Sequence, residues 1–141
     1  MTMRRQDKYP DTEVFHYFNA NPKNRITTDC VVRAICLATQ KSYATVVMDL
    51  AKLQCETGYD DGDKPLIDRY LQMQGFLKQK QPKKPNGKKY TGGEFCKKVA
   101  TKSGRYVANI GGHHVVAIVD RKVNDIWDST DGCIGNYWVK Y

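Results

Sequence analysis

The sequence predicts an α+β fold in which N-terminal helices pack on a C-terminal antiparallel sheet. Apolar residues recur at helical spacing up to Gly104, and short segments rich in β-branched and aromatic residues follow it. Blocks of helices followed by blocks of strands are typical of this fold class. With 141 residues, of which 40% are hydrophobic, the chain is expected to form one domain over 1–141 with a self-sufficient core.

The helical region contains four predicted helices, preceded by an irregular segment over 1–23 with a short strand or turn near Val14–Phe18. The first helix, CVVRAICLAT, is apolar at nearly every position except Arg33, which is typical of a buried helix. The expected starts and ends follow from N-cap residues, prolines and glycines. We expect helices from Cys30 to Thr39, from Tyr43 to near Gly58, from Asp63 to Gly75, and around Phe95 to Gly104.

The C-terminal region contains four predicted strands that form an antiparallel meander. The segments are RYVANI, HVVAIVD, KVNDIWD and GNYWVKY, separated by glycine-rich or turn-forming residues. The segment Val115–Val119 is apolar on both faces, so we expect it to lie in the centre of the sheet, covered on one side by the Cys30 helix.

Composition favours a protein of the cytoplasm. Five cysteines form an odd set without any C-x-x-C pair, which indicates a reducing compartment. No apolar run approaches the ~20 residues that a membrane-spanning helix needs, and the N-terminus does not resemble a secretory signal. We therefore expect no membrane association.

The net charge of +8 is concentrated in one segment. KQKQPKKPNGKK, within a predicted basic loop over 78–93, holds six lysines and no apolar residue. Such a loop serves solubility or attracts an acidic partner or nucleic acid. Because no aromatic residue is interleaved with the lysines to stack on bases, we favour the solubility role for the Lys78–Lys89 loop.

The candidate chemistry is nucleophilic catalysis. Cys30 lies at a predicted helix start, where backbone N–H groups and the helix dipole favour a thiolate. A thiol nucleophile needs an imidazole base, and the base needs an orienting group. His114 opens the central strand and Asp128 ends the next one, so we predict that they lie side by side, with Asp125 as the alternative orienter. Asn24, six residues before Cys30, is a candidate oxyanion donor.

At these residues the sequence resembles the papain-like cysteine peptidase superfamily over about residues 24–130. TTDCVVRAICLAT is similar to its active-site helix, and GGHHVVAIVDRKVNDIWD to its histidine strand and third catalytic residue. The resemblance implies a papain-like fold and assigns the catalytic roles to Cys30, His114 and Asp128. A literal match to the Gly-His step makes His113 the base instead, whereas the apolar alternation that follows favours His114.

Within that superfamily the layout is nearest to the bacteriocin leader peptidase-like domains. They resemble this chain in having a cysteine helix, a second helix, a short helix ending in Gly-Phe, here Gly75–Phe76, and then a Gly-His strand. That subgroup usually carries glutamine before the cysteine, where this chain offers Asn24. The resemblance implies a cytoplasmic peptidase or amidase of phage or bacterial origin that acts on a protein or peptide.

Three other functions compete with this hypothesis. The first is a peptidoglycan amidase of the CHAP class, which has a similar cysteine helix and histidine strand. The second is a non-catalytic papain-like scaffold that binds a host protein, and the third is a nucleic-acid binder, each using the basic loop. No metal or other cofactor is expected, because His113 and His114 would point to opposite faces of a strand and no paired cysteines support zinc.

Overall fold

The computed structural model describes residues 3–141 and has helices packed on a mixed six-stranded sheet. The α+β fold class is therefore confirmed. The helices are α1 (Arg5–Lys8), α2 (Cys30–Thr39), α3 (Tyr43–Thr57), α4 (Lys64–Met73) and α5 (Gly92–Lys98). The strands are β1 (Phe15–Tyr17), β2 (Leu77–Gln79), β3 (Arg105–Ile110), β4 (His114–Val119), β5 (Lys122–Asp125) and β6 (Ile134–Lys140).

The helix boundaries follow local sequence signals closely. The helix predicted from Cys30 begins at that residue, and α3 ends at Gly58, whose positive φ of 79° suits glycine at a helix C-terminus. The helix α4 begins after Asp63 and carries proline in its first turn. A capping box at Thr91 and Glu94 starts α5, which ends at Lys98, earlier than the predicted end at Gly104.

The prediction of a purely antiparallel meander is wrong. The strand order is β1-β5-β4-β3-β6-β2, with β1 parallel to β5 and every other pair antiparallel. The chain returns from β5 to pair β6 with β3, and β1 occupies the other edge of β5. The β4 strand does lie in the interior of the sheet, as its two apolar faces predict.

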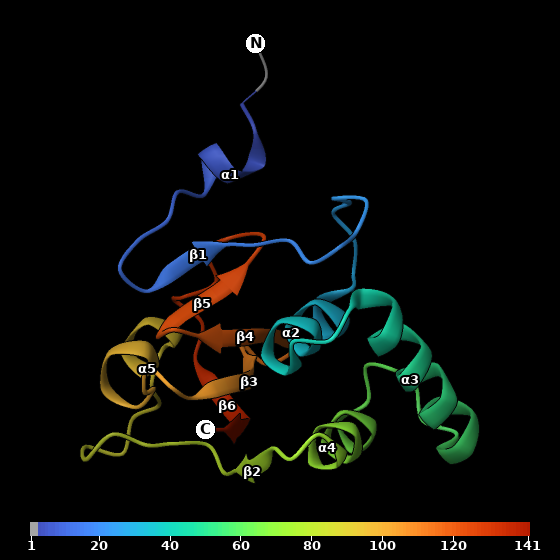
Figure 1. The fold of residues 1–141 in the computed structure, drawn as a ribbon. Helices are drawn as coiled ribbons and strands as arrows, with labels where there is room; N and C mark the ends of the chain where they lie inside the picture. The colour runs from blue at the N-terminus through green and yellow to red at the C-terminus, as the bar shows by residue number, and fades with distance from the viewer. Residues whose placement is uncertain (1–2) are drawn as a thin grey trace.

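The helices cover both faces of the sheet and not one face as predicted. The helices α2, α3 and α4 pack with Val107, Val115 and Ala117, whereas Phe95 and Cys96 of α5 pack with Val116 and other residues of the opposite face. Figure 1 shows α5 on one side of β3 and β4, and α2 to α4 on the other. Alternate residues of one strand therefore enter two separate cores, which explains why the central strands contain almost no polar residue.

Two tight connections position the ends of β4. Asp120 and Arg121 both have positive φ, 54° and 58°, as the two central residues of a hairpin turn between β4 and β5 require. At the other end, Gly111 and Gly112 have φ of 62° and 94° and join β3 to β4. The start of β4 is thus placed beside the start of α2.

The predicted basic loop over 78–93 has more structure than expected. Its first residues belong to β2, which pairs with β6, and Lys83 and Lys89 form an isolated bridge around a turn. Lys84 forms an ion pair with Glu94, while most of the other lysines are exposed. None of the helices in residues 3–141 has the length and apolarity needed to cross a membrane.

Candidate active site

The candidate site lies where the N-terminus of α2 meets the first residue of β4. Cys30 is the first residue of α2, and it is half-buried against His114 and Val115. The glycine turn at 111–112 lies just before His114, and Asp29 is the last residue of the loop that leads into α2. The ends of these two loops place Cys30 beside His114. Two residues separated by more than eighty positions in the chain thus become neighbours.

The ring of His114 is held by a buried carboxylate. Its Nε2 lies 2.6 Å from Oδ2 of Asp125, whose side chain is 1% exposed. The ring of Trp127 lies beside the imidazole, with 5.2 Å between the two centroids. Because Nε2 is engaged by Asp125, Nδ1 is the ring nitrogen that remains for the thiol.

Asp128 does not occupy the predicted place beside His114. Its side chain is exposed, and its Oδ1 accepts hydrogen bonds from the backbone N–H and the hydroxyl of Thr130. Asp125 is the last residue of β5, whereas Asp128 lies three positions further along the chain, outside the strand. The paired residues of the β4–β5 ladder end at Ala117 and Asn124, so the ladder does not place residue 128 beside His114.

The electrostatics favour a thiolate–imidazolium pair. Burial opposes ionisation of Cys30, but hydrogen bonds from His114 and from the backbone of Val115 outweigh it and lower the thiol pKa below its ordinary 9.0. Burial likewise opposes the charged form of His114, yet its bonds with Asp125 and Cys30 raise its pKa from 6.5 to about 9. Each shift stabilises the charged form of its group.

The other buried cysteines show the opposite behaviour. Burial raises the pKa of Cys36 to about 11 and that of Cys96 to about 12, because the loss of water at each thiol outweighs the interactions that favour its thiolate. All five cysteines are free thiols. Of Cys30, Cys36 and Cys96, only Cys30 has a lowered thiol pKa, and it also contacts an imidazole.

A buried arginine connects the carboxylates on the two sides of the site. Arg33, 7% exposed, donates from Nε to Asp29 at 2.8 Å and from Nη1 to Asp125 at 3.2 Å. Asp125 also accepts bonds from the hydroxyl of Ser129 at 2.7 Å and from the backbone N–H of Ile126. Every donor around this carboxylate favours its charged form, and its pKa is lowered although burial opposes ionisation.

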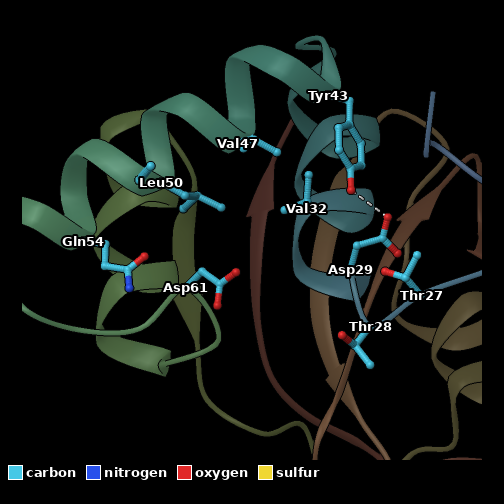
Figure 2. A pocket seen from close by; sticks show the side chains of 10 residues that line it. Thr27, Thr28, Asp29, Val32, Tyr43, Val47, Leu50, Gln54 and Asp61 are labelled. Atoms are coloured by element: carbon cyan, nitrogen blue, oxygen red, sulfur yellow. Dashed lines mark hydrogen bonds between the residues drawn. The ribbon is translucent and has the colours of Figure 1, made fainter. Parts of the chain in front are cut away.

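Asp29 fixes the loop that leads into α2. Although it is the N-cap residue, its carboxylate makes no capping bond and instead accepts bonds from Arg33, from the hydroxyl of Tyr43 at 2.8 Å and from the amide of Asn21 at 3.1 Å. Figure 2 shows Tyr43 reaching from α3 toward Asp29 at the side of a pocket between α2 and α3. Hydrogen bonds from α3 and from the loop around Asn21 therefore hold the start of α2 in place.

Sequence reasoning did not find Arg33. Its signal was a single charged residue in an otherwise apolar helix, placed four positions after Asp29, where the two side chains meet on one helix face. The predicted donor Asn24 does not take part in this arrangement. It lies in an exposed loop, where its side chain accepts a bond from Asn19, and it does not line the cavity beside Cys30.

His113 is exposed, and its side chain has no hydrogen bond within residues 3–141. His114, its neighbour, contacts both Asp125 and Cys30. The turn that carries both histidines separates two hollows. A cavity of about 210 Å³ borders Cys30, and a second of about 500 Å³ borders His114 and Trp127. A substrate that reached the thiol could therefore extend to both sides.

No group of three or more histidine, cysteine or acidic side chains in residues 3–141 is arranged to hold a metal ion. The site brings together a thiol of lowered pKa and an imidazole held by a carboxylate. No protein-family model, curated protein or solved structure matches this chain.

Proposed function

We propose that the protein is a cysteine hydrolase that cleaves an amide or peptide bond by acyl transfer. The observation that carries the proposal is the connected set of Cys30, His114 and Asp125, in which a thiol of lowered pKa contacts an imidazole held by a buried carboxylate. Perturbed titratable groups that meet beside a cavity are characteristic of catalytic sites. Isolated structural cysteines have no such partners, as Cys36 and Cys96 illustrate.

The proposed reaction begins with attack of the Cys30 thiolate on the substrate carbonyl carbon. A carbon–sulfur bond forms, and the carbonyl oxygen becomes an oxyanion that backbone N–H groups at the start of α2 stabilise. The imidazolium of His114 then donates its proton to the leaving amine as the carbon–nitrogen bond breaks. The products of this half-reaction are a thioester on Cys30 and a free amine.

Water completes the cycle. Neutral His114 accepts a proton from a water molecule, the resulting hydroxide attacks the thioester, and the carbon–sulfur bond breaks. The acid product leaves, and the thiolate–imidazolium pair is restored. Asp125 serves throughout as the positioning residue, because its bond to Nε2 keeps Nδ1 directed at the sulfur and stabilises the protonated ring.

The proposed catalytic order supports the resemblance to the papain-like superfamily. Cysteine at the start of a helix, histidine at the start of a strand, and an acidic residue on the following strand occur in that order along this chain. We propose a papain-like layout on this basis, with Asp125 in the third role in place of Asp128. Five free thiols agree with a proposed site of action in the reducing cytoplasm.

Thiol reactivity tests the proposal directly. Iodoacetamide is added to the native protein at neutral pH, and alkylation of each cysteine is followed by peptide mass spectrometry. Cys55 and Cys133 are exposed and serve as internal controls. Cys30 is expected to react at least about tenfold faster than both, because thiolate and not thiol is the nucleophile. His114→Ala should abolish that advantage, and equal rates for all three cysteines in the native protein would refute the proposal.

A second candidate function is binding without catalysis through the basic loop. Between Lys78 and Lys89, all lysines except Lys84 are exposed, and Lys84 is paired with Glu94. This function predicts affinity for DNA, RNA or an acidic protein that falls steeply with salt. Changing Lys83, Lys88 and Lys89 to glutamine should abolish that binding, whereas Cys30→Ala should leave it intact.

A further inference from the structure

The cavity beside Cys30 has a lining of both polar and apolar residues. Its walls come from the start of α2, the loop before α4, and the β3–β4 hairpin. Cys30 and Val31 border one side, Asp61 and Lys64 another, and Asn109 belongs to β3. At about 210 Å³ it is the smaller of the two hollows beside the catalytic pair, and it is the one that contains the nucleophile.

Asn109 is the unusual residue of this lining. It lies directly opposite Val115 in the β3–β4 ladder and is 5% exposed, and its Nδ2 is buried without a hydrogen-bond partner. The other buried polar side chains in residues 3–141, those of Arg33, Asp125 and Ser129, all have partners. An unpaired buried donor costs about 1–3 kcal/mol, so a group of this kind calls for a ligand that pairs with it.

The surroundings indicate which ligand fits. Asn109 shares its strand face with Val107, and the same face packs in the apolar core beneath α2 and α4. Asp61 and Lys64, of opposite charge, are both exposed in the wall of the cavity, and Asp29 is already paired with Arg33. The charges that border the cavity therefore balance, and a neutral side chain enters it without adding an uncompensated charge.

We propose that this cavity binds the side chain of a glutamine or asparagine residue in the substrate, and that Asn109 donates from Nδ2 to its side-chain carbonyl oxygen. The inference rests on the proposed hydrolase function and adds the substrate class: peptides with a carboxamide side chain at or next to the residue whose carbonyl Cys30 attacks. A primary amide satisfies the unpaired donor without bringing charge into the cavity. An aliphatic side chain of equal length leaves the donor unpaired.

The test uses peptide probes whose electrophile is a vinyl sulfone that alkylates the thiol. Two series are made, with the variable residue next to the electrophile or one position before it, and each contains glutamine, leucine and glutamate versions. The rate of covalent attachment to Cys30 is measured by intact-protein mass spectrometry. In at least one series the glutamine probe should react about fivefold to tenfold faster than the leucine probe. The leucine probe leaves the buried donor unpaired, which weakens its binding. The glutamate probe should be the slowest.

Variants at position 109 separate recognition from folding. Asn109→Leu keeps the approximate side-chain size and Asn109→Val suits a strand, and both remove the donor. Each should abolish or reverse the preference for glutamine, and urea unfolding followed by circular dichroism should show that each variant is folded. A native protein that reacts quickly with iodoacetamide but shows no preference between glutamine and leucine, or variants that keep the preference, would overturn the inference. Slow reaction of Cys30 with iodoacetamide would instead count against the hydrolase function itself.

Discussion

Replacing Asp125 with asparagine should inactivate the thiol while leaving the shape of the side chain intact. The carboxylate accepts hydrogen bonds from His114, Arg33, Ser129 and the backbone of Ile126. An amide places an N–H₂ group where one carboxylate oxygen faced a donor, and it removes the charge that stabilises the imidazolium. The pKa of His114 should therefore fall and that of the Cys30 thiol should rise.

The magnitude follows from the His114 pKa. It lies at about 9 against an ordinary 6.5, and bonds with Asp125 and with Cys30 both raise it. If Asp125 supplies about half of that rise, Asp125→Asn lowers the His114 pKa by about one unit, or about 1.4 kcal/mol. A comparable rise in the Cys30 pKa lowers the thiolate fraction about tenfold at any pH below that pKa.

The assay compares this variant with a matched control. Asp128→Asn makes the same chemical change three residues along the chain, on an exposed side chain that bonds only with Thr130. The iodoacetamide rate at Cys30 is measured across the pH range, and the ring protons of His114 are titrated by NMR. Asp125→Asn should slow alkylation about tenfold and Asp128→Asn less than about twofold, as for other surface changes. Equal effects of the two variants would refute the assignment of Asp125.

Three further predictions concern the charges around the site. Arg33→Met removes the cation that Asp29 shares with Asp125, although Asp125 keeps His114 as a partner, and should lower the free energy of unfolding in urea by about 3–5 kcal/mol; a loss below about 1 kcal/mol would contradict the role of Arg33. Because the folded-state pKa values of Asp29 and Asp125 lie below the ordinary 3.8, their contribution to stability is present above that pH and should disappear as the pH falls through the lowered values, which acid unfolding followed by circular dichroism measures. Hydrolysis of a peptide substrate, once one is found, should decline above about pH 9 as His114 loses its proton, and a rate that keeps rising beyond that pH would contradict its role as the acid.

Local signals in the sequence predicted the elements well. Gly58, Asp63 and the cap before Cys30 define helix ends through backbone geometry that depends on one or two residues. The order of strands could not be predicted in the same way. The edge of β5 is occupied by β1, which is only three residues long and so gives a weak signal in the sequence, and β6 pairs with β3 instead.

The choice between Asp125 and Asp128 could not be made from the register of the hairpin. The turn at Asp120 and Arg121 fixes the pairs next to it, but those pairs end at Asn124. Alternation along β4 assigns His114 to the face of Val116, which packs toward α5, whereas Cys30 lies on the face of α2. The contact of His114 with Cys30 and Asp125 therefore depends on local geometry at the end of the ladder, which alternation does not predict. Asn109 likewise gives no sequence signal that separates it from an ordinary polar strand residue.

The same buried charges hold the fold together and prepare the nucleophile. The ion pair of Arg33 with Asp125 joins α2 to β5. The charge of Arg33 directly lowers the pKa of Cys30, and Asp125 acts on Cys30 through its bond to His114. Replacement of a buried ion pair by apolar residues is often neutral or stabilising, so stability alone does not account for these two residues. Simultaneous replacement of Arg33 and Asp125 by apolar residues should therefore recover much of the stability that Arg33→Met loses, whereas the reactivity of Cys30 should stay low. A double variant that recovered both would show that the charges serve the fold only.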